Sequence, residues 1–253
     1  MTMIKKYIIF IAVVFLFGGC VSIYNPATQR NEFILIDTAS EISLGSTMSK
    51  QINSESKISN DAAWNERLNR AGQKVAQASD RNDIKYQFFV VEDDDLNAFA
   101  LPGGFVYVHS AVLKEANDDE LACVLAHEIG HIAARHSVKR LQVVLGYQIV
   151  MSLAFSKSSA VDLYKAINVV FNVVSLGYSR EDERLADRLA VKYAYKSNYK
   201  PEAMISFFNK LKAQSGQRGE SYNLVFLSSH PPIDERINNV KKEISLLAVT
   251  SQP

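Results

Sequence analysis

Two histidines and a glutamate stand at a spacing that suits metal-assisted hydrolysis. His127 and His131 are four residues apart, and Glu128 directly follows the first histidine. Residues four apart share one face of a helix, so both imidazoles can bind a single zinc ion. Glu128 is not a ligand in this arrangement and can instead accept a proton from the metal-bound water. The surrounding residues are almost all apolar, which predicts a buried helix and argues against a chance pair of histidines.

A zinc site of this kind needs a third protein ligand, and the downstream sequence limits the choice. Ala134 and Ser137 occupy the positions where a metzincin has glycine and a third histidine, which excludes that class. His136 would lie about 140° around a continuous helix from His131, so we expect it to point elsewhere. A glutamate from farther along the chain is therefore the expected third ligand.

The acidic segment at 179–187 is the best source of that glutamate. Glu183 and Asp187 share one face of the helix predicted there, and Ala186 leaves room for a close approach. Glu183 can bind the metal, and Asp187 can hold a ligand histidine by its other ring nitrogen. Taken alone, the segment would be interpreted as a solvent-exposed helix face, and only its pairing with the first motif favours the metal site.

Four motifs follow one another along the chain, and together they carry a family resemblance. They are NAFALPGG at 97–104, HEIGH at 127–131, SREDERLAD at 179–187, and HPP at 230–232 with Arg236. In this order they resemble the HtpX and CAAX-prenyl-protease type of gluzincin metallopeptidase. The resemblance implies a zinc endopeptidase with one Zn²⁺ per chain. It also implies that the ligands are His127, His131 and Glu183, with Glu128 as the base.

The resemblance adds expectations for the remaining residues of these motifs. It implies that His230 lies near the metal, where it either assists catalysis or blocks the open coordination position. Asp187 and Arg236 are expected behind the ligands, although Arg236 alone would be interpreted as a surface charge. A strand edge near the metal helix could hold an extended peptide by backbone hydrogen bonds. The expected substrate-binding residues are Asn97, Phe99, Gly103 and Gly104.

The N-terminus is typical of a bacterial lipoprotein signal. Two lysines precede an apolar run at 7–17, and Leu16-Phe-Gly-Gly-Cys20 resembles a lipobox. We predict a signal peptide at 1–19, a lipid on Cys20 and a tether at 20–36. A single metallopeptidase domain at 37–247 and a tail at 248–253 are expected to follow. Val21, where aspartate would favour retention at the inner membrane, predicts the periplasmic side of the outer membrane.

The expected function is cleavage of misfolded or unassembled envelope proteins. Protein and peptide substrates are expected, with the outer-membrane assembly machinery as a candidate partner. A formal net charge of +1 gives no reason to expect nucleic acid. The alternative is a zinc-stabilised, chaperone-like binding module with little proteolysis, and a weaker one is a zinc amidase acting on cell-wall peptides. Glu128 argues against a purely structural site, which would not need that group.

Mostly helical elements must position these residues. The pattern predicts an α+β, zincin-like fold with one small antiparallel sheet beside the metal helix. Cys123 lies among apolar residues and is expected in the core rather than at the metal. Strands are expected at 85–91, 98–101 and 105–109. Besides the two motif helices, helices are expected at 38–52, 61–78, 141–155, 161–176, 201–216 and 233–247.

Overall fold

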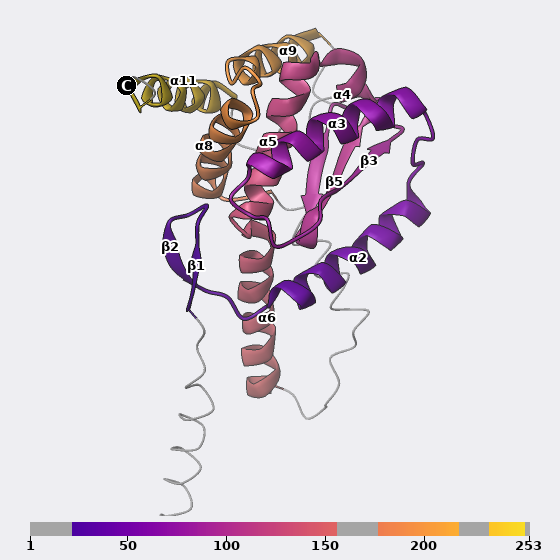
Figure 1. Cartoon of the computed structure of the whole chain (residues 1–253). Helices are drawn as coiled ribbons and strands as arrows, with labels where there is room; N and C mark the ends of the chain where they lie inside the picture. Colours follow the sequence, from indigo (N-terminus) through magenta and orange to yellow (C-terminus); the bar gives the residue numbers. More distant parts are fainter. Residues whose placement is uncertain (1–21, 156–176, 218–232, 251–253) are drawn as a thin grey trace, which may run out of the picture.

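A computed structural model describes residues 22–155, 177–217 and 233–250 of the chain. The predicted signal peptide, Cys20, the helix expected at 161–176 and His230 lie outside these residues. Within the described residues the fold is α+β and mostly helical, which confirms the predicted class (Figure 1).

Helix α5 (Asp118–Ala133) lies in the middle of the fold and carries the two histidines (Figure 1). Its first turn is closed by a capping box, in which Asn117 and Glu120 each accept a hydrogen bond from the other's backbone N–H. Ser206 and Lys210 of helix α9 (Ala203–Gln217) also donate to the buried Glu120 carboxylate. Every residue from Glu120 to Ala133 is buried. The contacts above therefore match the negative charge of Glu120 at the start of this buried segment.

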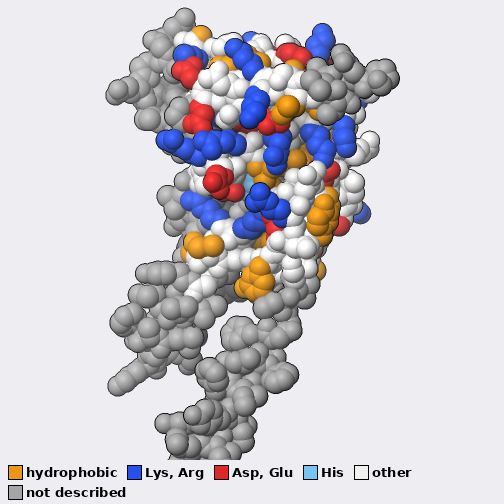
Figure 2. Space-filling model, turned by 90° about the vertical axis from the view of Figure 1, so that its left-hand side faces the viewer, with side chains coloured by type: hydrophobic (Ala, Val, Ile, Leu, Met, Phe, Trp, Pro, Cys, Tyr) orange, Lys and Arg blue, Asp and Glu red, His pale blue; other side chains and the backbone are white. Residues whose placement is uncertain are grey.

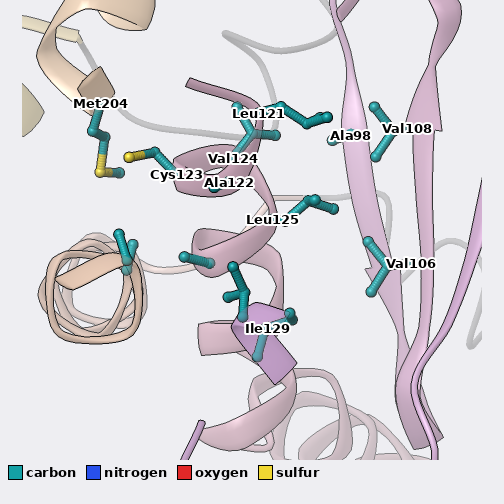
Figure 3. Packing of buried hydrophobic residues seen from close by; sticks show 14 of the residues in the cluster. Ala98, Val106, Val108, Leu121, Ala122, Cys123, Val124, Leu125, Ile129 and Met204 are labelled. Atoms are coloured by element: carbon teal, nitrogen blue, oxygen red, sulfur yellow. The ribbon is translucent and has the colours of Figure 1, made fainter. Parts of the chain in front are cut away.

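A three-stranded sheet covers one side of α5. Its strand order is β3 (Gln87–Val91), β5 (Phe105–His109) and β4 (Ala98–Leu101). β4 and β5 form the expected antiparallel hairpin, whereas β3 pairs with β5 in parallel. The sheet beside the metal helix is therefore mixed, and helix α3 (Ala62–Ala78), which precedes β3, packs against that strand. Figure 3 shows Leu121 and Leu125 of α5 facing this sheet.

The turn between β4 and β5 is a short 3₁₀ segment, η1 (Pro102–Gly104). Gly103 has a φ of 78°, a backbone conformation that glycine adopts without strain. A Cβ at this position would lie 2.6 Å from the Cα of Ile42 in helix α2 (Thr38–Glu55). The glycine thus allows α2 to pack directly against the turn.

The remaining helices surround α5. Helix α8 (Arg180–Lys196) lies along the side of α5 that faces away from the sheet, with α9 and α11 (Ile233–Thr250) near one end (Figure 1). Helix α4 (Ser110–Glu115) follows β5, and helix α6 (His136–Phe155) extends from the end of α5. None of the described helices combines the length and hydrophobicity needed to cross a bilayer.

The range expected to be a tether is structured from Ser22 onward. β1 (Ser22–Asn25) and β2 (Arg30–Phe33) form an antiparallel hairpin. The Asn25 side-chain amide donates to the backbone oxygen of Ala133 at 3.3 Å, and Lys139 of α6 forms an ion pair with Glu32. The hairpin is therefore attached to the junction of α5 and α6.

Candidate active site

The three predicted ligands converge at one buried point between α5 and α8. His127 Nε2 lies 3.1 Å from His131 Nε2. The Glu183 carboxylate lies 3.5 Å from His127 Nε2 and 3.4 Å from His131 Nε2. Tetrahedral ligands about 2.05 Å from a zinc ion are separated by about 3.3 Å. Two imidazoles and one carboxylate at these separations fit a zinc-sized divalent cation.

The close approach of α8 places Glu183 within reach of the two histidines. Gly130 of α5 faces Ala186 of α8, and a Cβ at Gly130 would lie only 3.1 Å from the Ala186 backbone oxygen. Ser179 accepts a hydrogen bond from the Asp182 N–H and so caps the start of α8. Small residues at the helix contact and a defined helix start together position the carboxylate in the first turn.

Asp187 and Arg236 lie behind His127. Asp187 Oδ1 is 2.9 Å from His127 Nδ1, which assigns the ring proton to Nδ1 and leaves Nε2 available to a metal. Arg236 of α11 donates to both carboxylate oxygens of Asp187, at 2.6 and 3.0 Å. Burial opposes ionisation of Asp187, but the contacts with Arg236 and His127 together outweigh it and hold the carboxyl pKa below its usual value.

The electrostatics of this site favour a neutral His127. Burial, followed by the charge of Arg236, lowers the His127 pKa to about 3. A metal ligand must be the neutral imidazole, so this environment suits the role. The structure thus brings Asp187 and Arg236 to the positions that the sequence predicted for them.

Glu128 is also buried, beside the ligand cluster. Burial, followed by the nearby Glu183 carboxylate, raises the Glu128 pKa well above its usual value. A hydrogen bond from the backbone of Ala100 in β4 partly offsets this shift. Glu128 therefore lies between the metal ligands and the sheet, in an environment that favours holding a proton.

The residues predicted to bind substrate have different surroundings. Phe99 is partly exposed on β4, and its ring stacks on Tyr107 at 5.0 Å. The Asn97 backbone oxygen accepts from the His109 N–H, and Gly103 N–H donates to Glu41. Gly104 is buried against Lys85. The close packing of the turn thus explains the two glycines without a role in substrate binding. Substrate contact by Asn97, Phe99, Gly103 or Gly104 stays a prediction.

His136 contradicts the expectation that it points away from the metal ligands. Helix α5 ends at Ala133, and Arg135 adopts a φ of 55° before α6 begins at His136. This break turns the chain, so that His136 Nδ1 lies 2.9 Å from His131 Nδ1. The expectation was wrong because it assumed one continuous helix, and the local sequence contains no glycine or proline to indicate a break.

Tyr178 is a second residue that sequence reasoning missed. Its ring stacks on His131 with centroids 4.0 Å apart, and its hydroxyl lies 2.7 Å from the Ser137 hydroxyl. Cys123, in contrast, lies in the core as predicted, and Figure 3 shows it directed at Met204 rather than at the histidines.

Comparison with known proteins places this site in a family. Residues 62–244 match the model of peptidase family M48. The chain belongs to peptidase family M48. This membership makes the chain a metallopeptidase of the gluzincin type, in agreement with the resemblance and the ligand cluster.

Several curated proteins are similar over most of the chain. The mitochondrial metalloendopeptidase OMA1 of Saccharomyces cerevisiae is 28% identical, over 90% of this chain and 72% of that protein. OMA1 of Schizosaccharomyces pombe is 30% identical, over 69% of this chain and 51% of that protein. The beta-barrel assembly-enhancing protease of Escherichia coli is 25% identical, over 79% of this chain and 43% of that protein. The chain thus spans about half the length of the last two proteins, or less.

A solved structure is also similar. The crystal structure of S. mikatae Ste24p matches with a TM-score of 0.46 and 19% identity, covering 94% of this chain and 65% of that one.

Proposed function

We propose that this protein is a zinc-dependent endopeptidase. The observation that carries the proposal is the convergence of His127, His131 and Glu183 within 4.8 Å of one another, with Glu128 buried beside them. Two histidines and one glutamate are a ligand set of catalytic zinc sites, which keep a further position open for water or substrate. A bound zinc ion would supply a Lewis acid and a water that loses its proton near neutral pH.

The side chains around this position have separable tasks. Glu128 takes the proton from the attacking water and passes it to the leaving amine nitrogen, which requires a carboxylate that holds a proton readily. Glu128 lies buried beside the ligand cluster, where this transfer would take place. Asp187 keeps His127 in the tautomer that binds through Nε2, and Arg236 keeps Asp187 ionised.

We propose that the substrate is an extended segment of an unfolded protein, bound along β4. Within the described residues, β4 pairs only with β5, so its other edge can add a peptide strand. The contact between Ala100 and Glu128 brings this strand to the base. The beta-barrel assembly-enhancing proteases among the similar proteins support a setting in beta-barrel assembly, and we propose misfolded or unassembled envelope proteins as the substrate class.

Cleavage of unfolded casein by the zinc-loaded protein, measured beside its Glu128→Gln variant, tests this function. We expect cleavage by the wild type only, with folded proteins spared. Equal cleavage by both proteins would contradict the role of Glu128. No cleavage by either, with zinc bound in equimolar amount, would contradict the endopeptidase and favour the chaperone-like binding module.

We further propose that a lipid on Cys20 holds the protein at a membrane of the cell envelope. Only two residue steps separate Cys20 from Ser22, the start of β1, so the hairpin would lie within about 7 Å of the lipid attachment. Tyr24, Phe33 and Leu35 are 58%, 51% and 68% exposed in and beside this hairpin. Figure 2 shows hydrophobic side chains towards the lower end of the described surface, among lysines and arginines. This end suits a bilayer surface.

Val143 of α6 is another exposed apolar side chain, at 72%. It follows Gln142, whose side chain accepts a hydrogen bond from the Leu35 N–H beside the hairpin. Flotation of the lipidated protein with liposomes tests both ideas. Cys20→Ala should abolish flotation, and Val143→Asp should weaken the flotation of the lipidated protein. Leu246→Asp, at an exposed leucine of α11, should have no effect. Flotation that survives Cys20→Ala would contradict the anchor.

A further inference from the structure

The break between α5 and α6 creates a contact that a continuous helix would not allow. Arg135, with its φ of 55°, is held by its side chain, which donates to Thr38 at 2.9 Å and lies 3.6 Å from Asp83. The chain therefore turns immediately after α5, and His136 becomes the first residue of α6. Its side chain is buried directly against His131, with the two ring centroids 5.0 Å apart.

The two nitrogens of His131 face different partners. Nε2 faces His127 and Glu183, at the position of the metal, whereas Nδ1 lies 2.9 Å from His136 Nδ1. The other nitrogen of His136, Nε2, lies 3.3 Å from a carboxylate oxygen of Asp182. Asp182, His136 and His131 thus form a chain of contacts that leads from the start of α8 to the metal position, in which the contact between Asp182 and His136 is electrostatic and not a hydrogen bond of normal geometry.

The proton positions along this chain follow from the chemistry of imidazole. A metal-binding Nε2 must keep its lone pair, so the proton of His131 resides on Nδ1. His136 Nδ1 then accepts that proton in a hydrogen bond, because two ring nitrogens at 2.9 Å can share only one proton. The proton of His136 is left on Nε2, where it faces the negative charge of Asp182.

We propose that His136 is a positioning residue for the metal ligand His131, and that Asp182 orients His136 in turn. The two ligand histidines would then be held in different ways. Asp187, a carboxylate, contacts His127 directly, whereas a neutral imidazole lies between His131 and its carboxylate. Groups that hold the far nitrogen of a ligand histidine fix its tautomer and ring orientation, and their loss weakens metal binding. The inference rests on the proposed metal site.

Two substitutions at His136 separate this role from simple packing. Phenylalanine keeps a ring of similar size but cannot accept the His131 proton. Asparagine is smaller but places its side-chain oxygen close to the position of Nδ1. We expect His136→Phe to weaken zinc affinity by about 10- to 100-fold, and His136→Asn to recover most of that loss. The affinity is measured by competition with a chromophoric chelator, and the Co²⁺ absorption spectrum reports the ligand geometry.

Matched controls come from the same chain. His109 is another buried histidine, whose Nδ1 lies 3.2 Å from the backbone oxygen of Asp95, and His109→Phe should leave zinc affinity unchanged. Asp182 and Ser179 both belong to the capping box of α8. Asp182→Ala should therefore weaken zinc binding more than Ser179→Ala, although both variants lose the cap. Thermal unfolding of the zinc-free proteins shows that each variant is folded.

The outcomes distinguish this inference from the proposed function. If the wild type failed to bind zinc, the metal site and this inference would both be wrong. If the wild type bound zinc but His136→Phe bound it equally well, only the inference would be overturned. Equal losses in His136→Phe and His136→Asn, or an equal loss in His109→Phe, would show that His136 acts by packing alone.

Discussion

Replacing Gly130 with alanine should disturb the metal site through the contact between its two helices. A Cβ at Gly130 would lie 3.1 Å from the Ala186 backbone oxygen and 3.3 Å from its Cα, where ordinary contacts begin at 3.4 Å. Both are backbone atoms of α8, so no side-chain rotation can relieve the overlap. We therefore expect α8 to move away from α5 by about 0.3 Å, the difference between these distances.

The size of the effect follows from two opposing contributions. Alanine favours a helix over glycine by about 0.8–1 kcal/mol, whereas overpacking costs about 1–3 kcal/mol. The expected net destabilisation of the zinc-free protein is about 0–2 kcal/mol. A metal–ligand distance is defined to about 0.2 Å, so a helix displacement of this size should misplace Glu183. If zinc binding has to bring α8 back to its original position, the strain energy is subtracted from the free energy of zinc binding. A strain of about 1.4 kcal/mol would lower zinc affinity tenfold.

Gly146 provides the matched control for this prediction. It lies in α6, and a Cβ there would meet no atom of the described residues within 4 Å. Gly146→Ala should therefore stabilise the protein by up to about 1 kcal/mol and leave zinc affinity unchanged. Urea unfolding and chelator competition measure the two quantities. If Gly130→Ala were as stabilising as Gly146→Ala and bound zinc normally, the close packing of α5 and α8 would not position Glu183.

Three further predictions follow from buried groups. Arg236→Met should lower the free energy of unfolding by about 3–5 kcal/mol, because it leaves the buried Asp187 carboxylate without its cation. Urea unfolding measures this change, and a loss below about 1 kcal/mol would contradict the prediction. Burial raises the pKa of the Cys123 thiol, so iodoacetamide should alkylate Cys123 only in denaturant. Mass spectrometry measures the labelling, and alkylation of the folded protein at about pH 8 would contradict the prediction. Burial lowers the pKa of His109, so the unfolded chain takes up a proton that the folded one does not, and stability should fall as the pH drops below about 6.5. His109→Phe should reduce that pH dependence in urea midpoints, and an unchanged dependence would refute it.

Local patterns predicted the ligand helices and the turn near them. The spacing of His127 and His131 brings the two side chains to one face only on a helix, and the apolar residues around them indicate that this helix is buried. The strands at 98–101 and 105–109 have the bounds expected from the Pro-Gly-Gly turn between them. Glu183 was identifiable because few acidic residues follow the histidines before α8. The metal helix and the turn are each encoded within a few residues, whereas Glu183 lies 52 positions after His131 and was assigned only by its pairing with that motif.

Features that depend on distant contacts were not predictable in the same way. Arg135 takes a left-handed conformation without a glycine, and contacts of its side chain with Thr38 and Asp83 hold it there. The position of His136 depends on that conformation. Likewise, the hairpin from Ser22 has no clear alternation of polar and apolar residues, and its attachment to Ala133 spans 108 positions of sequence.

Zinc binding and hydrolysis, measured together for two glutamate variants, test whether Glu183 binds the metal and Glu128 transfers the proton. We expect Glu128→Gln to bind one zinc ion per chain yet cleave no casein, and Glu183→Gln to lose zinc affinity. Normal zinc affinity in Glu183→Gln, or casein cleavage by Glu128→Gln, would contradict these roles.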